Sequence, residues 1–528
     1  VSGGLDFASL HDNETIQPLK IPSSQDVRDG IRSSTRRSNY VWTFNGSATV
    51  TRDINDWIVS RTTAGASYFN QKNLSTNCRG VGLIQGTFSC GTTTRNPTID
   101  ENFFQIITIG FYGSQEFQLN DRLFITASAR ADDNSAFGEN FGLQWYPNAS
   151  VSWVVSEESF FDLSWMPELR VRGAFGTSGL RPNFRQAVTL FNPNSVRLAG
   201  ADVAAVNIGS TGNPELKPER TTEFELGFDA GLFNNKVGLD FTYFTKKSKD
   251  ALISRRLQPS LGLTTSQFAN LGEVKNWGTE TSISLEALNT SDFGVDVRAS
   301  WSTFGNEITQ LSPDGSVEPI IFNRGVQRHQ QGISAGAFYR TDFTFSDANG
   351  DGLISEDEIT YTDTAVFLGS VLPTWQGSFS LSIRAWDWLS ISNLFEARGG
   401  NKQLDGTEDF RCGLFAMCRA NNEPGAPLIE QARSVASRFG GTDAGYVRSA
   451  DFLKWRELAV TINVPDNWLT QLQGLSLTLA GRNLATWTDY PGLDPEINER
   501  GASSNFSQNE FLTLPPVRSY SLRLNYAF

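Results

Sequence analysis

Three observations on the sequence predict an all-β protein, and more specifically a transmembrane antiparallel β-barrel. Apolar and polar residues alternate with a period of two in about 17 segments, many longer than the ~5–6 residues of an ordinary strand. No stretch contains the roughly 20 consecutive apolar residues of a membrane helix, whereas a barrel strand needs only about 9–11 alternating residues. The connections between the segments mostly alternate short and long, as expected for short periplasmic turns and long extracellular loops.

The clearest strand is the last one. One face of 520–528 would carry only apolar or aromatic residues: Tyr520, Leu522, Leu524, Tyr526 and Phe528. The other face would carry Ser521, Arg523, Asn525 and Ala527. We expect the first set to face lipid, and Arg523 and Asn525 to face the lumen, because lipid-facing and lumen-facing residues alternate in such barrels.

The same pattern places strands along most of the chain. We expect them near 38–52, 57–69, 102–118, 122–134, 145–155, 167–177, 220–232, 236–248, 268–286, 293–310, 316–328, 335–346, 374–385, 388–398, 446–464, 474–487 and 516–528. The segment 316–328 is included because the alternation of short and long connections requires it. Residues 1–37 are then a loop or an incomplete preceding strand, and residues 38–528 are barrel strands with long extracellular loops.

The strand count itself carries a prediction. Bacterial single-chain barrels have an even number of strands, and about 17 is odd, so we expect earlier strands to be missing from this chain. Five more would complete about 22 strands, the number found in plugged outer-membrane transporters. The chain begins at Val1 without a signal segment, which indicates a processed or truncated piece.

Charge and histidine content exclude other classes of protein. The formal net charge is -13, so nucleic acid is not expected as a partner, because phosphate binding needs a basic surface. The two histidines, His11 and His329, are isolated in sequence and are expected on the surface or in loops. They give little support for a hydrolase of the Ser/His/Asp type, and we expect no enzyme.

The four cysteines form two close pairs, Cys78 with Cys90 and Cys412 with Cys418. Neither pair has the clustered Cys and His ligands of a zinc site or the CxxC spacing of a redox site. We therefore expect two disulfides, each within an extracellular loop. The alternative is that the cysteines are unpaired and close only by chance.

Six segments together resemble one family. They are NPELKPER at 213–220 with TTEFELG at 221–227, NLATWTDYPGLDPE at 483–496, FLKWREL at 452–458 ending in Val464-Pro465, and RADDNSAFG at 130–138 with WYPNAS at 145–150 and GTSG at 176–179. These resemble the barrel signatures of TonB-dependent receptors, and specifically of the SusC/RagA branch. The resemblance runs from about residue 100 to the end, so the chain would be the C-terminal part of such a barrel.

The resemblance implies a multi-pass protein of the bacterial outer membrane, embedded in its lipid. Members import oligosaccharides, peptides or similar nutrients, often beneath a surface lipoprotein lid of the SusD type. Contact with TonB would run through a plug region that is not in this chain, because residues 1–37 contain neither a plug nor a TonB box. The alternative is a surface receptor or adhesin barrel that binds without transporting.

One motif has the chemistry of a metal site. The segment DANGDGLISEDE at 347–358 fits the calcium-loop pattern D-x-[DN]-x-[DN]-G-x5-E at every position. The expected ligands to a structural Ca²⁺ are Asp347, Asn349, Asp351, the carbonyl of Leu353, Ser355 and Glu358, with Gly352 allowing the sharp bend. The flanks predict strands, so no helix–loop–helix sensor is expected. The alternative is an acidic turn exposed to solvent.

Overall fold

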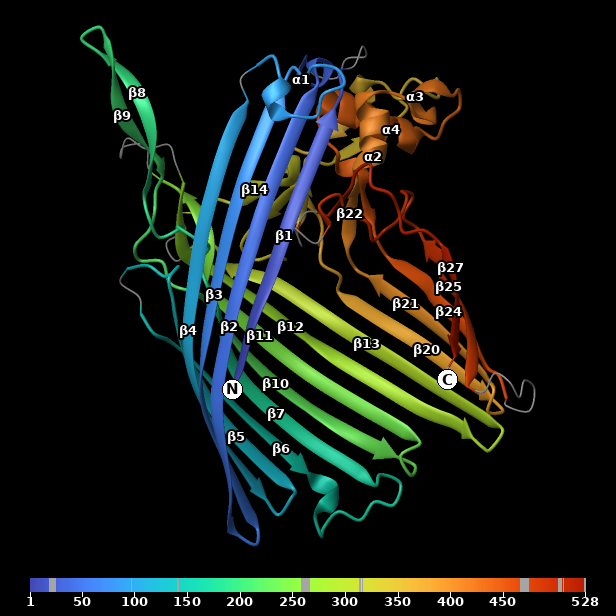
Figure 1. Cartoon of the computed structure of the whole chain (residues 1–528). Helices are drawn as coiled ribbons and strands as arrows, with labels where there is room; N and C mark the ends of the chain where they lie inside the picture. The colour runs from blue at the N-terminus through green and yellow to red at the C-terminus, as the bar shows by residue number, and fades with distance from the viewer. Residues whose placement is uncertain are drawn as a thin grey trace. The chain divides into compact units, whose positions relative to one another are not determined.

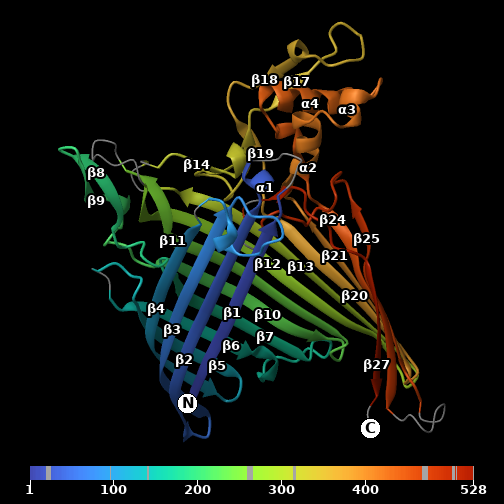
Figure 2. The same ribbon diagram turned by 45° about the horizontal axis from the view of Figure 1, so that its top comes forward.

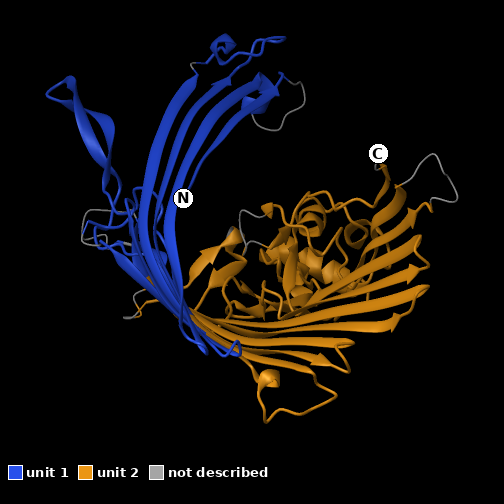
Figure 3. Cartoon of the chain, turned by 60° about the horizontal axis from the view of Figure 1, so that its bottom comes forward, with its two compact units in different colours: residues 1–150, 176–221, 250–270 blue, residues 151–175, 222–249, 271–528 orange. Residues whose placement is uncertain are grey.

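The structure is a computed structural model that describes residues 1–18, 25–95, 97–139, 142–257, 266–312, 315, 317–465, 474–501, 506 and 508–526. The chain divides into two compact units, coloured separately in Figure 3. Unit 1 comprises residues 1–150, 176–221 and 250–270, and unit 2 comprises 151–175, 222–249 and 271–528. Each unit is described by itself.

Most strands belong to one antiparallel sheet of 16 strands that follow one another in chain order. The sheet order begins with β1 and ends with β27. Five of these strands contribute residues to both units: β6 (Gln144–Val154), β7 (Glu168–Leu180), β10 (Glu219–Leu232), β11 (Val237–Arg256) and β12 (Ser266–Asn289). The all-β fold class predicted from the alternation is confirmed.

Unit 1 contains the longest strands. Its sheet strands are β1 (Ser2–Ile16), β2 (Ile31–Asn55), β3 (Ile58–Val81), β4 (Thr98–Leu119) and β5 (Leu123–Asn134), of which β2 has 25 residues. Strands β1 to β4 run side by side in Figure 1. β1 lies within residues 1–37, the segment that was expected to be a loop or an incomplete preceding strand. The unit also contains α1 (Gln25–Asp29), the 3₁₀ turn Cys90–Thr92 and the hairpin of β8 (Leu190–Leu198) and β9 (Ala201–Ser210).

Unit 2 continues the sheet with shorter strands. They are β13 (Phe293–Gln310), β20 (Trp375–Ala385), β21 (Leu389–Gly399), β24 (Phe452–Asn463), β25 (Leu475–Thr488) and β27 (Ser519–Tyr526). Each pairs antiparallel with the next, and Figure 2 shows β20, β21, β24 and β25 side by side.

The connections mostly alternate in length as predicted, except that residues 155–167 between β6 and β7 form a longer connection than residues 135–143 before them. The short ones cover residues 56–57, 120–122, 233–236, 290–292 and 386–388, and the long ones include 82–97, 181–218, 311–374, 400–451 and 489–518. In the turn between β4 and β5, Asn120 and Asp121 have φ angles of 48° and 57°. Asn and Asp tolerate this left-handed region, so the sequence favours a tight hairpin at this point.

The register of the last two strands supports the predicted faces. Leu522, Leu524 and Tyr526 of β27 pair with Leu479, Leu477 and Leu475 of β25, so the apolar residues of both strands share one face. Arg523 and Asn525 pair with Thr478 and Ser476 on the other face. Phe528 lies outside the described residues.

Two predicted barrel strands are wrong. The segments 316–328 and 335–346 lie in the long connection between β13 and β20 and form only three-residue strands of separate small sheets. They contain residues with positive φ, Asn323 (47°), Gly325 (87°) and Gly336 (75°), which interrupt an extended strand. Because two strands, an even number, are removed from the predicted order, the remaining connections still fall on the expected sides of the membrane. The predicted strand 446–464 is also shorter, because 447–449 pair elsewhere as β23.

The long connections of unit 2 build an assembly of their own. Its helices are α2 (Gly406–Asp409), α3 (Arg419–Asn422) and α4 (Leu428–Gly440), with a π turn at Phe410–Leu414 and 3₁₀ turns at Asn323–Gly325, Glu356–Glu358 and Ala444–Tyr446. Its strands are β14 (Ile320–Phe322), β15 (Gln327–His329), β16 (Phe338–Arg340), β17 (Phe343–Phe345), β18 (Ile359–Tyr361), β19 (Val366–Gly369), β22 (Lys402–Asp405), β23 (Val447–Ser449) and β26 (Asn509–Glu510).

This outer-loop assembly has two small apolar cores. One gathers Val326, Phe338, Val371, Leu404, Tyr446 and the Cys412 and Cys418 side chains, and the other gathers Ile354, Ile359, Ala432 and Ala436. The second core joins α4 to the β17–β18 hairpin, and Figure 2 shows these elements grouped together. Within the described residues, no helix has the length and apolarity needed to cross a membrane.

Candidate functional site

The candidate calcium loop is closed at its base by a short hairpin. Phe345 of β17 pairs with Ile359 of β18, and the amide of Ser346 donates to the carbonyl oxygen of Glu358 at 3.0 Å. The predicted flanking strands are therefore present, and the two ends of the 12-residue motif are held together. This pairing brings Asp347, at the start of the motif, close to Glu358, at its end.

The loop's own amides orient its side-chain oxygens. Asp347 accepts from the amides of Gly350 (2.8 Å) and Gly352 (3.0 Å), and Asp351 accepts from the amide of Leu353 (2.8 Å). The side-chain oxygen of Asn349 accepts from the amide of Asp351 at 2.9 Å. Gly352 has φ of +76°, so the bend predicted at this glycine is confirmed.

Glu358 is fixed from both sides of the loop. One carboxylate oxygen accepts from the amide of Ala348 at 2.8 Å, and the other accepts from the amide of Ser355 at 3.0 Å. The hydrogen bond from the Ser355 amide, followed by those from Ala348 and Asn349, holds the pKa of Glu358 below its ordinary value. Glu358 is therefore charged at neutral pH, as a bidentate calcium ligand must be.

The donor set fits a hard cation, because every group at the ligand positions offers oxygen, from a side chain or, at Leu353, from the backbone carbonyl. The carboxylate oxygens of Asp347, Asp351 and Glu358 do not all lie within 4.8 Å of one another. A bound ion would therefore draw them inward. Calcium accepts six to eight oxygens in a flexible geometry, which tolerates such an adjustment better than the strict octahedron of Mg²⁺.

Helix α4 supports the loop from the side. Ile354 is 6% exposed and packs against Ala432 and Ala436 of α4. Gln431 of α4 accepts from the amide of Ile354 at 3.0 Å and donates to the carbonyl oxygen of Gly352 at 3.1 Å. Gln431 could not be predicted from the sequence, since a single glutamine on a helix carries no recognisable signal.

Both expected disulfides are present. The Cα atoms are 6.4 Å apart in Cys78–Cys90 and 5.1 Å apart in Cys412–Cys418, and none of the described cysteines is free. The expectation that each lies within one loop is wrong for the first pair. Strand β3 extends to Val81, so Cys78 belongs to a strand and is joined to the 3₁₀ turn that begins at Cys90.

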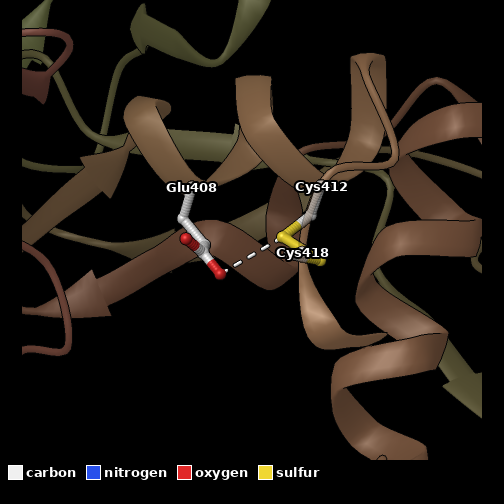
Figure 4. Close-up of side chains that lie close together, drawn as sticks. All are labelled: Glu408, Cys412 and Cys418. Atoms are coloured by element: carbon white, nitrogen blue, oxygen red, sulfur yellow. Dashed lines mark hydrogen bonds between the residues drawn. A yellow bond between two sulfur atoms is a disulfide. The ribbon is translucent and has the colours of Figure 1, made fainter. Parts of the chain in front are cut away.

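The second disulfide lies beside a carboxylate. Figure 4 shows Glu408 pointing toward Cys412 and Cys418, with Oε1 of Glu408 at 3.2 Å from Sγ of Cys412. In the described part of the chain, this is the one group of three Cys, His or acidic side chains whose ligand atoms lie within 4.8 Å of one another. It is not a metal site in this state, because both sulfurs are used in the disulfide and no thiolate is available.

A buried ion-pair cluster lies where β24 meets the segment after β25. The Nζ of Lys454, whose side chain is 4% exposed, lies 2.7 Å from Asp494 and 2.5 Å from Glu496. Arg456 also pairs with Glu496 at 2.5 Å. These residues belong to two of the family motifs, at 452–458 and 483–496, but their contact was not predicted from the sequence. The structure gives the two motifs a common role, which is to fasten a loop to a strand.

A charged pocket of about 680 Å³ opens beside the Cys412–Cys418 disulfide. Its lining includes Asp405, Arg433, Tyr446 and Arg448, from β22, α4, a 3₁₀ turn and β23. Burial, with a smaller contribution from the carboxylates of Glu510 and Glu408, raises the pKa of Asp405 to about 6. This pocket was not predicted from the sequence, because its residues are spread over more than 80 positions of the chain.

The two histidines do not form a catalytic constellation. His11 is exposed on β1. His329 lies in β15, where its Nδ1 accepts from the amide of Gly336 at 3.0 Å and its ring contacts Phe322 and Phe506. Burial lowers the pKa of His329. These contacts assign His329 a packing role.

Comparison with known proteins identifies the class. Residues 1–484 match the family model for the TonB dependent receptor-like β-barrel. TonB-dependent receptor P3 of Formosa agariphila is 26% identical over 83% of this chain and 47% of its own length. TonB-dependent receptor SusC of Bacteroides thetaiotaomicron is 24% identical over 74% of this chain and 41% of its own. The chain thus spans about half the length of the curated relatives it matches.

Solved structures share the fold. A chain of the RagAB peptide transporter superposes with a TM-score of 0.79 at 20% identity, over 98% of this chain and 58% of that chain. The RagAB peptide importer in the 'open-open' state gives a TM-score of 0.78 over 98% of this chain and 58% of that chain.

These observations define a β-barrel protein of the outer membrane. The chain belongs to the TonB dependent receptor-like β-barrel family, and SusC is among the proteins to which it is similar. The resemblance to TonB-dependent receptors inferred from the six sequence segments is therefore confirmed.

Proposed function

We propose that this chain is part of a TonB-dependent receptor that imports oligosaccharides, peptides or similar nutrients across the outer membrane. The observation that carries the proposal is the family match over residues 1–484. Similarity to SusC and to a chain of the RagAB peptide transporter supports nutrient import over binding alone. Nothing in the described fold requires the protein to be an enzyme.

The complete barrel would have about 22 strands, the size of plugged transporters, so six would come from other residues of the protein in addition to the 16 described here. Energy coupling would reach the receptor through a plug and TonB box outside this chain. A SusD-like surface lipoprotein is the proposed partner at the extracellular end, where the outer-loop assembly would meet it. Outer-membrane lipid would surround the apolar face of the strands.

An uptake experiment separates import from binding alone. Cells that express the full-length receptor should accumulate a labelled oligosaccharide or peptide, and collapse of the proton-motive force should abolish the accumulation. A tagged receptor should co-purify with an acylated surface protein. Surface binding that is insensitive to the proton-motive force, without accumulation, would instead indicate a receptor or adhesin.

We also propose that Asp347–Glu358 binds a structural Ca²⁺ in the outer-loop assembly. Asp347, Asn349, Asp351, Leu353, Ser355 and Glu358 would provide the ligands. The two-stranded base of the loop and its contact with α4 support this assignment, because they pre-order the oxygens before an ion arrives. Binding would stiffen the loop without exposing a groove, since strands rather than helices flank it.

Calorimetric titration of the full-length receptor in detergent tests this site. Ca²⁺ should release a saturable heat that is absent in Asp351→Ala and preserved in Asp363→Ala, which changes an exposed acid outside the motif. Mg²⁺ should bind more weakly because it demands a strict octahedron. Identical heats for wild type and Asp351→Ala would mean that the segment is only an acidic turn.

A further inference from the structure

We propose that the charged pocket beside the Cys412–Cys418 disulfide binds the carboxylate group of a ligand through Arg433 and Arg448. The ligand class is a small molecule or chain end that carries one carboxylate. This inference rests on the proposed import function and adds to it the chemical class of the receptor's ligand.

The pocket has the size and construction of a ligand site. Its volume of about 680 Å³ lies within the range of ~300–1,000 Å³ typical of small-molecule sites. Arg433 lies on α4, Arg448 lies on β23, and Tyr446 lies between them in the chain. The helix, the strand and the nearby disulfide hold these side chains on ordered elements, which favours a preformed site.

The two arginines differ from the other arginines of the pocket in having no carboxylate partner. Arg411 pairs with Glu408 at 2.6 Å, and Arg419 pairs with Glu430 at 2.5 Å. Among the described residues, no carboxylate oxygen lies within 4.0 Å of a nitrogen of Arg433 or Arg448. The Nε of Arg448 is also buried without a hydrogen-bond acceptor.

Partial burial of Arg433 and Arg448 without a carboxylate partner is unfavourable unless an anion binds to them. A buried donor without an acceptor loses its hydration and gains nothing in return. The guanidinium groups also repel each other: burial and then the charge of Arg448 lower the pKa of Arg433, and burial lowers the pKa of Arg448. A carboxylate placed between them would accept charge-assisted hydrogen bonds from both and remove this repulsion.

The acidic lining limits the charge of the ligand. Five carboxylates line the pocket: Asp405, Glu408, Glu423, Glu430 and Asp489. Glu408 and Glu430 are neutralised by their arginine partners, which leaves three acids against Arg433 and Arg448. These acids would repel a sulfated or phosphorylated polyanion more strongly than a ligand with a single carboxylate, and they would attract a cationic body next to that carboxylate.

The rest of the ligand would contact less polar groups. Met417, Ala420 and the Cys412–Cys418 disulfide form part of the lining. The carboxylate could come from a peptide C-terminus or from an acidic sugar, and both place an uncharged body next to one carboxylate. The two sources share the chemistry that Arg433 and Arg448 would recognise.

Calorimetry on the full-length receptor in detergent tests the pocket directly. The probes are N-acetyl-tri-alanine and its neutral C-terminal amide, and galacturonate and its neutral methyl ester. At least one carboxylate probe should bind at least about tenfold more tightly than its neutral counterpart, because hydrogen bonds to a charged group are strong. The pair that shows this preference identifies the source of the carboxylate.

Variants assign the binding to the two arginines. Arg433→Gln and Arg448→Gln should each weaken the preferred probe at least about tenfold, and Arg448→Lys, which keeps the charge, should weaken it less. Arg438→Gln changes an exposed arginine on the same helix and should bind like wild type. Thermal unfolding of each variant checks that it is folded, and Arg448→Lys provides a test if the glutamine variants are not.

Three results would overturn the proposal: no binding of any probe, equal binding of acid and neutral forms, or unchanged binding in all the arginine variants. Loss of uptake with carboxylate binding intact would argue against import and leave this pocket standing. Uptake that continues although no carboxylate probe binds would argue against carboxylate binding in this pocket, but not against import.

Discussion

The amide of Ile354 donates a hydrogen bond of 3.0 Å to Oε1 of Gln431, 77 residues further along the chain. Gln431 also donates to the carbonyl oxygens of Gly352 (3.1 Å) and Ala426 (2.8 Å). One buried side chain therefore satisfies three backbone groups and fastens the candidate calcium loop to α4. A motif that is continuous in sequence thus depends for its order on a distant helix.

Gln431→Leu should loosen the loop. The substitution keeps a similar volume but leaves the Ile354 amide and two carbonyl oxygens without partners, at a cost of about 1–3 kcal/mol for each group that stays buried. Hydrogen exchange should become faster in residues 343–361, while strands β20 and β21 keep their protection. Arg438→Gln is the matched control on α4. Unchanged exchange in the loop would mean that the Ile354 side chain alone anchors it.

The contrast between the calcium motif and Gln431 shows what the sequence could predict. Strands of the sheet repeat with a period of two, and ligands of the motif lie within 12 consecutive positions, so both are local patterns. The short strands at 320–322 and 327–329 have too few residues to show a period. Gln431, Arg433 and Arg448 acquire their roles only through contacts made by folding, which a single sequence does not reveal.

Lys454→Met should destabilise the attachment of the segment 489–501 to β24. The substitution leaves Asp494, whose side chain is 10% exposed, without its cation, while Glu496 keeps Arg456. Removal of one partner of a buried ion pair typically costs about 3–5 kcal/mol. The thermal unfolding midpoint in detergent should fall clearly, and the double variant Lys454→Met/Asp494→Leu should recover part of the loss. No recovery would show that packing of the lysine stem, rather than charge, dominates.

The same cluster predicts a loss of stability in acid. Burial alone would raise the pKa of Glu496, but hydrogen bonds from Arg456 and Lys454 outweigh it and hold the pKa below its ordinary value of 4.5. A depressed pKa adds stability that is present above pH 4.5 and is lost as the pH falls through the lower folded value. Unfolding midpoints measured from pH 6 downward should therefore drop more steeply for wild type than for Glu496→Gln. Parallel curves would contradict this assignment.

The last prediction concerns the lipid face of β27. Leu524 is 64% exposed and pairs with Leu477, whereas its neighbour Asn525 pairs with Ser476 on the opposite face. An arginine at a midplane lipid-facing position of an outer-membrane barrel costs about 2–4 kcal/mol, and a lumen-facing arginine has no such penalty. Leu524→Arg should therefore reduce the amount of folded receptor in the outer membrane, measured by heat-modifiable migration on gels, far more than Asn525→Arg. Similar levels of the two variants would show that Leu524 does not face lipid.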